Sequence, residues 1–156
     1  MKKLNKKGFT LIELLAVIAI LAILMLLVTP NILEMFTKGR KDAFVTNAQS
    51  VWKAAEQQYL NDSISAAGAG VGGPYCSTKF TPTGVTCKAI PTIASAYDYY
   101  IDFKADGNIH NFILVDSNFQ VATVDKNIDL KADVQNRNAS LTKVTCTSGT
   151  CSLSNK

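Results

Sequence analysis

The sequence has few of the residues that mark catalytic or nucleic-acid-binding proteins. Of its 156 residues, 18% are charged, one is a histidine and four are prolines. The 16 basic residues exceed the 12 acidic ones by four, and the whole excess lies in Lys2, Lys3, Lys6 and Lys7. The chain after Gly8 therefore has no net charge and no basic stripe, which excludes a nucleic-acid-binding protein that depends on bulk charge.

Motifs for nucleotide binding and catalysis are also missing. The glycine-rich run at residues 66–74 has no Lys-Ser or Lys-Thr in P-loop spacing and no strand before it, so it indicates a flexible connector. His110 falls in a predicted strand with no Ser or Cys nucleophile pattern around it, which favours packing or exposure over catalysis. We therefore expect neither an enzyme nor a cofactor.

Apolar residues are plentiful and concentrated near the start of the chain. They make up 47% of the sequence, which excludes wholesale disorder in a chain about one domain long. Residues 14–28 are uninterrupted apolar residues, and only Thr10 and Glu13 interrupt the 20 residues from 9 to 28. This is about the ~20 residues that a helix needs to cross a bilayer, and the basic flank before it predicts a cytoplasmic N-terminus.

The position of the small residues is unusual for a secretory signal. Such a signal is cut after its apolar core, but here the core is followed by Thr29, Pro30 and Asn31. The abrupt change lies before the core, at Gly8 and Phe9. A cut between these two residues would leave the whole apolar helix on the mature protein.

Glu13 is the one charged residue within this apolar segment. A carboxylate in a membrane helix costs a few kcal/mol, about 2.5 to 3.5 for a charge at the centre and less near the interface. Glu13 is therefore a candidate functional residue. The alternative is that it lies at the level of the lipid headgroups, where it costs little.

The segment Lys-Lys-Gly-Phe-Thr-Leu-Ile-Glu-Leu-Leu at residues 6–15 resembles the class III leader and helix start of type IV pilins and pseudopilins. The resemblance covers about the first 60 residues. It implies that residues 1–8 are a leader, and that a prepilin peptidase cuts between Gly8 and Phe9 and methylates the new amine. It also implies that Phe9, Glu13 and Pro30 serve assembly, with the Glu13 carboxylate pairing with the Phe9 amine of a neighbouring subunit.

The periodicity predicts one helix over residues 9–60, whose apolar half is residues 9–30 and whose amphipathic half is residues 31–61. Unlike many pilins, the chain has no glycine in the middle of the apolar half, so we expect a kink only at residues 26–30, before Pro30. Beyond it, a stripe of apolar residues predicts the face that packs against the head: Leu33, Phe36, Phe44, Ala48, Val51, Ala55 and Tyr59.

The remainder, residues 62–156, is predicted to be a globular β head. Strand patterns at residues 97–103, 109–115 and 119–124 are separated by the turn signals Asp106-Gly107 and Ser117-Asn118, which predicts a three-stranded antiparallel meander. One face of this sheet would cover the helix stripe. The expected fold class is therefore α+β, a long N-terminal helix packed on a small antiparallel sheet in two layers, as in the pilin fold.

Four cysteines, Cys76, Cys87, Cys146 and Cys151, all lie in this head. An even number in an exported domain predicts two disulfides with three possible connectivities. We favour Cys76–Cys87 with Cys146–Cys151, because each pair closes a short loop rich in turn residues, while the nested pairing of Cys76 with Cys151 and Cys87 with Cys146 stays open.

Metal binding is not expected. The cysteine spacings do not match the close pairs of structural zinc sites. Asp98, Asp102 and Asp106 recur every four residues but lack the spacing of an EF-hand calcium loop.

Together these features predict a major pilin, the structural subunit of a type IV pilus filament that serves adhesion, motility or DNA uptake. Its expected partners are further copies of itself, a prepilin peptidase, and the assembly platform with its ATPase motors. The precursor would cross the cytoplasmic membrane once before entering an extracellular filament. The alternatives are a minor pilin or pseudopilin of a secretion or competence system and, in another class, a monomeric membrane-anchored binding protein.

Overall fold

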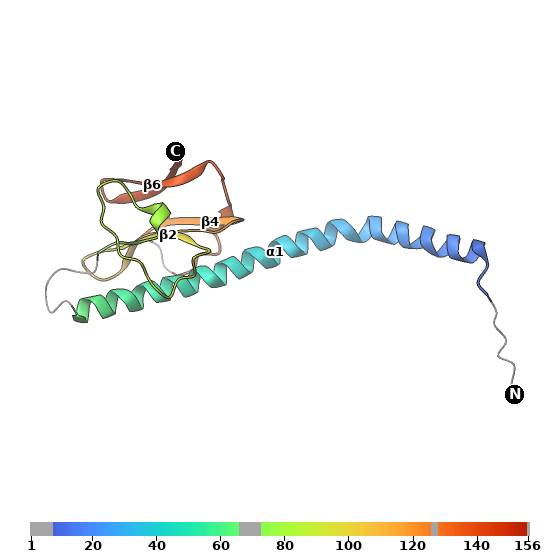
Figure 1. Ribbon diagram of the computed structural model, residues 1–156, viewed down its shortest axis with the longest axis horizontal. Helices are drawn as coiled ribbons and strands as arrows, with labels where there is room; N and C mark the ends of the chain where they lie inside the picture. The colour runs from blue at the N-terminus through green and yellow to red at the C-terminus, as the bar shows by residue number, and fades with distance from the viewer. Residues whose placement is uncertain (1–7, 66–72, 126–127, 156) are drawn as a thin grey trace, which may run out of the picture. The chain divides into compact units, whose positions relative to one another are not determined.

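The computed structural model describes residues 8–65, 73–125 and 128–155 (Figure 1). The chain forms two compact units, residues 1–40 and residues 41–156, which we call the N-terminal unit and the head unit. Most of the predicted leader and of the glycine-rich connector lies outside the described residues.

One helix, α1 (Leu11–Ser65), runs through the N-terminal unit and into the head unit. It begins two residues later and ends five residues later than the predicted helix at residues 9–60. The helix includes Pro30 and Gly39 without interruption. Continuous helical hydrogen bonding does not determine the bend angle, and the kink expected before Pro30 stays a prediction. Between its first turn and Glu34 the helix contains no charged residue, and leucine, isoleucine and alanine, which dominate there, favour helix.

The head unit contains a five-stranded antiparallel sheet in the order β1-β2-β3-β4-β5. Its three long strands, β2 (Asp98–Phe103), β3 (Ile109–Val115) and β4 (Phe119–Val124), form the predicted meander. The two-residue edge strands β1 (Tyr75–Cys76) and β5 (Gln135–Asn136) were not predicted, because two residues show no periodicity. The α+β fold class is confirmed.

The first face of this sheet packs on α1 through three aromatic pairs. Their ring centroids are 5.8 Å apart for Phe44 and Phe119, 5.0 Å for Trp52 and Phe112, and 4.3 Å for Tyr59 and Phe103. Gly107, in the turn between β2 and β3, has a φ of +85°, and a Cβ there would lie 3.4 Å from the Tyr59 ring. Only glycine adopts this conformation without cost, which is the physical basis of the Asp-Gly turn signal.

The apolar stripe of the helix was predicted to pack against the head, and this prediction is correct for its members in the head unit and wrong for those in the N-terminal unit. Its five later members, Phe44, Ala48, Val51, Ala55 and Tyr59, are buried. Leu33 and Phe36 are exposed, at 62% and 65% of their maximal accessible area. They belong to the N-terminal unit, so helical periodicity continues beyond the residues that pack on the sheet.

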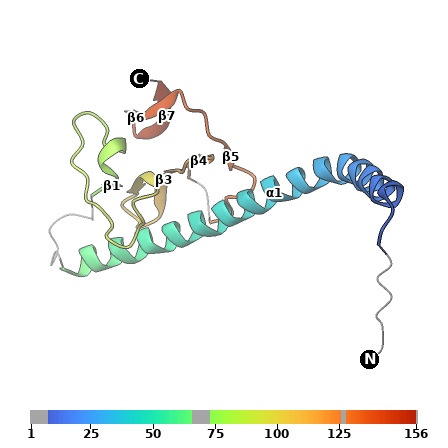
Figure 2. The same ribbon diagram turned by 45° about the vertical axis from the view of Figure 1, so that its right-hand side comes forward.

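The second face of the sheet is covered as well, which corrects the predicted two-layer head to three layers. A separate hairpin of β6 (Leu141–Thr147) and β7 (Thr150–Asn155) lies on the side opposite α1 (Figures 1 and 2). A second cluster of buried side chains fills this interface, with Tyr100, Ile113 and Val115 from the sheet and Val144 and Cys151 from the hairpin. Strand β3 is therefore buried on both faces, as its nearly continuous apolar sequence allows.

The disulfides of the structure join Cys76 to Cys87 and Cys146 to Cys151. The first ties β1 to the loop before β2, and the second joins directly opposed residues of β6 and β7. This is the local pairing rather than the nested one.

Candidate processing and assembly site

The first turn of α1 is closed by a reciprocal pair of hydrogen bonds between Thr10 and Glu13. The Thr10 backbone N–H and hydroxyl both donate to Glu13 Oε2 at 2.8 Å, and the Glu13 backbone N–H donates to Thr10 Oγ1 at 3.4 Å. This arrangement is a capping box, in which two otherwise unpaired donors at a helix start are satisfied by each other's side chains. The Glu13 carboxylate is thereby oriented toward the N-terminal end of the helix.

The residues before the helix are accessible. Gly8, Phe9 and Thr10 have no regular secondary structure and are exposed, Phe9 at 93%. Nothing lies within 4 Å of a Cβ built on Gly8. The Gly8–Phe9 bond therefore lies in an exposed, non-helical segment immediately before the helix.

The N-terminal unit buries none of its described residues. Its helix is long and apolar enough to cross a membrane by length and composition. Thr29, a polar residue within this surface, donates its hydroxyl to the Met25 carbonyl at 2.6 Å. That internal bond satisfies the hydroxyl, so Thr29 adds little polarity to the apolar surface.

The three aspartates considered for calcium do not form a site. Asp98 contacts the Lys79 ammonium at 3.3 Å, Asp102 accepts hydrogen bonds from Asn111, and Asp106 accepts one from the Asn108 backbone N–H. Within the described residues no group of three or more His, Cys, Asp or Glu side chains could hold a metal ion.

His110, expected to be merely packed or exposed, has specific partners. Its Nδ1 lies 2.7 Å from Asp125 Oδ1, which also contacts the Lys104 ammonium at 2.7 Å. The hydrogen bond to Asp125 is the main cause that raises the pKa of His110 above its ordinary value of 6.5. Hydrogen bonds from Lys104 and His110 lower the pKa of Asp125.

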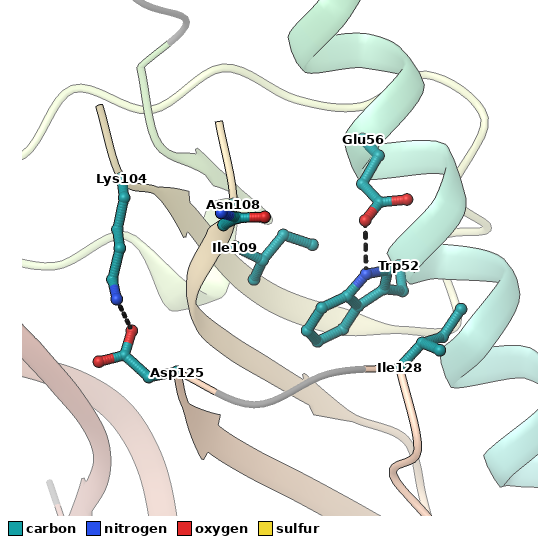
Figure 3. Close-up of a pocket in the computed structure, with 7 residues that line it drawn as sticks. All are labelled: Trp52, Glu56, Lys104, Asn108, Ile109, Asp125 and Ile128. Atoms are coloured by element: carbon teal, nitrogen blue, oxygen red, sulfur yellow. Dashed lines mark hydrogen bonds and ion pairs between the residues drawn. The ribbon is translucent and has the colours of Figure 1, made fainter. Parts of the chain in front are cut away.

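A cavity of about 560 Å³ lies in the head unit beside α1 and the turn between β2 and β3 (Figure 3). Its charged side chains are already paired with neighbours. Glu56 accepts a hydrogen bond from Trp52 Nε1 at 2.8 Å, and Lys104 pairs with Asp125. Among the described residues, the charged side chains that line the cavity are therefore held by neighbouring groups.

Sequence reasoning identified Gly8, Phe9 and Glu13 but missed the role of Thr10. The signal was present, because Thr-x-x-Glu directly before an apolar run is the sequence signature of a capping box. The cysteines and Pro30 do not join this site in the structure: the cysteines lie in the head unit, and Pro30 lies 17 positions beyond Glu13 within α1.

Comparison with known families matches residues 3–29 to the prokaryotic N-terminal methylation motif. The matched range includes the leader from Lys3 onward, Gly8, Phe9 and Glu13, and it ends just before Pro30. No curated protein and no solved structure matches the chain. Proteins with this motif are generally structural rather than enzymatic. Residues 3–29 thus form a class III signal, the N-terminal motif typical of the type IV pilins and pseudopilins that prepilin peptidases process.

Proposed function

We propose that the protein is a structural subunit, a major pilin, of a type IV pilus filament. The observation that carries the proposal is the N-terminal unit itself, an apolar helix with no buried residue among those described, whose first part lies within the residues that match the methylation motif. An apolar surface of this length is unstable in water and needs either lipid or further copies of the same helix.

Maturation would begin at the Gly8–Phe9 bond. A prepilin peptidase would hydrolyse this bond, remove the leader with its four lysines, and methylate the new amine of Phe9. Removal of the leader takes away the positive charge that holds the N-terminus on the cytoplasmic side. The mature chain then starts with an ammonium group four residues before Glu13 and retains the apolar helix.

The Glu13 carboxylate would receive that ammonium group from a neighbouring copy. Both Thr10 donors bond to Oε2, and within the described residues Oε1 accepts no hydrogen bond. A carboxylate and an ammonium group are each costly in an apolar filament core when unpaired, and each supplies the partner that the other lacks. Their pairing would fix the axial register of adjacent helices.

Glu13→Ala tests this role against a matched control, Glu34→Ala. Glu34 is the next carboxylate of the same helix, but it is exposed and pairs with Lys38 at 2.8 Å. We expect Glu13→Ala to leave membrane insertion intact and to reduce filament yield strongly, whereas Glu34→Ala gives normal yield. Wild-type yield from Glu13→Ala would exclude the register role.

Mass spectrometry of sheared surface fibres tests the proposed function as a whole. For a major pilin, this chain dominates the fibres and begins with N-methylated Phe9. Cleavage and methylation without abundance in the fibres would instead indicate a minor pilin or pseudopilin. A membrane-anchored binding protein would give a different result. The chain would stay monomeric in the membrane, and substitution of Gly8 or Glu13 would change neither its processing nor its assembly.

A further inference from the structure

A β-bulge in β3 brings two polar side chains toward the β6–β7 hairpin. Asp102 of β2 pairs with Asn111 and the next residue, Phe103, pairs with Ile109, so His110 is the additional residue on β3. A bulge of this kind redirects a side chain and is a recurrent feature of functional positions in sheets. Here it leaves Ile109 in the core against α1, while His110 and Asn111 both reach the hairpin tip.

Asn111 bonds to the hairpin with both ends of its side-chain amide. Its Nδ2 donates to the Gly149 carbonyl at 2.8 Å, and its Oδ1 accepts the Cys151 N–H at 2.9 Å. Asn111 is fully buried, and Asp102 fixes its orientation by accepting from both its backbone N–H and its Nδ2. Breaking these bonds without a replacement would leave buried polar groups unpaired, which is costly.

His110 contacts the same tip from a second side. A Cβ built on Gly149 would lie 3.9 Å from His110 Nε2, so this ring nitrogen lies beside the hairpin tip. The other ring nitrogen, Nδ1, faces Asp125, whose backbone N–H also donates to the His110 carbonyl at 2.8 Å. A doubly protonated ring carries an N–H group on the Asp125 side and a second one on the side of the hairpin tip, whereas a neutral ring carries only one of the two.

The hairpin is a natural candidate for independent opening. It forms a two-stranded sheet of its own, and an isolated two-stranded hairpin is marginally stable in water. The Cys146–Cys151 disulfide joins its two strands next to the tip, so they stay paired when the hairpin leaves the sheet.

We propose that Asn111 and His110 form a proton-dependent latch that holds the β6–β7 hairpin on the second face of the sheet. The hairpin opens as one unit while the sheet and α1 remain folded, and it opens more readily when His110 is neutral. Opening uncovers the apolar side chains of Tyr100, Ile113 and Val115, which the closed hairpin buries. The latch lies wholly in the head unit and does not depend on the filament function.

The direction of the pH effect follows from the charges around His110. Asp125 at the end of β4 and Asp102 on β2 both favour the protonated ring, and burial opposes it. Lys104 and Asp106 lie in the turn before β3, where Lys104 pairs with Asp125, and the hairpin approaches the ring with Gly149, which carries no charge. Asp125 raises the pKa of His110 whether the hairpin is closed or open, because neither residue belongs to the hairpin. Only the contact with the hairpin tip is lost on opening, so the stabilisation of the closed hairpin is complete below the open-state pKa and is lost as the pH rises through the closed-state pKa.

Hydrogen exchange on the full chain in detergent micelles tests the latch. After correction for intrinsic exchange rates, the amides of the hairpin should lose protection between pH 5.5 and pH 8.5 while those of β2 and β3 keep theirs. The slope should not exceed about tenfold per pH unit, because one proton is bound. His110→Gln should give hairpin protection that is independent of pH.

Three further variants separate the latch from general destabilisation. Asp125→Asn should move the midpoint of the pH dependence to lower pH, and Asp106→Asn, which removes a carboxylate that does not contact His110, should leave it unchanged. Asn111→Asp, which loses the Nδ2 donor, should lower hairpin protection about tenfold or more at every pH. An unchanged pH dependence in His110→Gln, or exchange of hairpin and sheet amides in one common step, would overturn the proposal.

Discussion

The two units of the chain differ in whether they bury their own apolar side chains. In the head unit, α1, the sheet and the hairpin bury their apolar side chains against one another in two clusters. In the N-terminal unit, every described residue is exposed, including all the large apolar side chains from Phe9 to Phe36. The head unit therefore covers its own apolar side chains, whereas the N-terminal unit leaves a long apolar surface exposed, which is unfavourable in water.

The same helix serves both purposes because the composition of its faces changes along its length. Before Glu34 the helix is apolar on all sides, which suits a surface that contacts neighbours in every direction. In the head unit, lysine, glutamate and glutamine occupy the outer faces and the apolar stripe narrows to one side. Substitutions that damage one unit should therefore leave the other intact.

Phe112→Ala should have the largest effect on the head unit. Phe112 is fully buried and its ring lies 5.0 Å from that of Trp52, so its removal leaves a cavity that costs about 3–5 kcal/mol in the free energy of unfolding. Denaturant unfolding followed by Trp52 fluorescence measures this loss. Leu21→Ala, in the exposed apolar helix, should change the same quantity by less than about 0.5 kcal/mol. Equal losses in the two variants would show that the units do not fold independently.

The two disulfides should rank next, and their order should follow loop length. The Cys76–Cys87 bond closes 11 residues of separation and the Cys146–Cys151 bond closes five. On the chain-entropy view each stabilises the head by about 2–3 kcal/mol, with the longer loop worth about 0.7 kcal/mol more. Paired Cys→Ala variants of each bond, compared by chemical denaturation, measure the difference. A larger loss from the shorter loop would mean that docking of the hairpin outweighs loop entropy.

Asp62 should give the head unit an acid-sensitive contribution of about 1.5 kcal/mol, because its carboxylate accepts hydrogen bonds from Lys88 and Tyr75. The bond from Lys88 is the main cause that lowers the pKa of Asp62 below 3.8. The stabilisation is therefore present above pH 3.8 and lost as the pH falls through the folded-state value. The difference in unfolding free energy between the wild type and Asp62→Asn should shrink as the pH falls toward 2.5. A difference that stays constant with pH would assign the effect to packing.

Thr10→Val should have a smaller and local effect, confined to the N-terminal unit. Valine keeps the shape of threonine but cannot accept a hydrogen bond from the Glu13 N–H. The loss of this hydrogen bond removes one half of the capping box. Amide exchange in the first turn of α1 should accelerate on the order of fivefold, and Thr10→Ser should restore most of the protection. Wild-type exchange in Thr10→Val would mean that the capping box does not hold the helix start.

The long helix and the three-stranded meander could be predicted because their signals are local. The apolar run, the helical spacing of Phe44 to Tyr59 and the Asp106-Gly107 turn each act over a few residues. The third layer could not be predicted, because the docking of β6 and β7 depends on Asn111 and on a bulge at His110, contacts that join residues about 40 positions apart. In the candidate site, the pattern of Gly8, Phe9 and Glu13 indicated processing and assembly roles that stay predictions, because the proposed pairing of Glu13 involves a second copy of the chain.

The exposed pair of Glu34 and Lys38 should have the smallest effect and sets the baseline for the others. The two side chains approach to 2.8 Å one helical turn apart, and both are about two thirds or more exposed. The Lys38 ammonium lowers the pKa of Glu34, but water and salt screen such surface pairs, so their net effect on stability is small. Glu34→Gln should leave the unfolding of the head unit unchanged and reduce helicity in the N-terminal unit only slightly, and 0.5 M NaCl should abolish even that difference, as circular dichroism in micelles can measure. A loss of head stability in Glu34→Gln would mean that the helical turn containing Glu34 couples the two units. The boundary between a head that folds by itself and a helix that does not would then lie before residue 34 and not at residue 40.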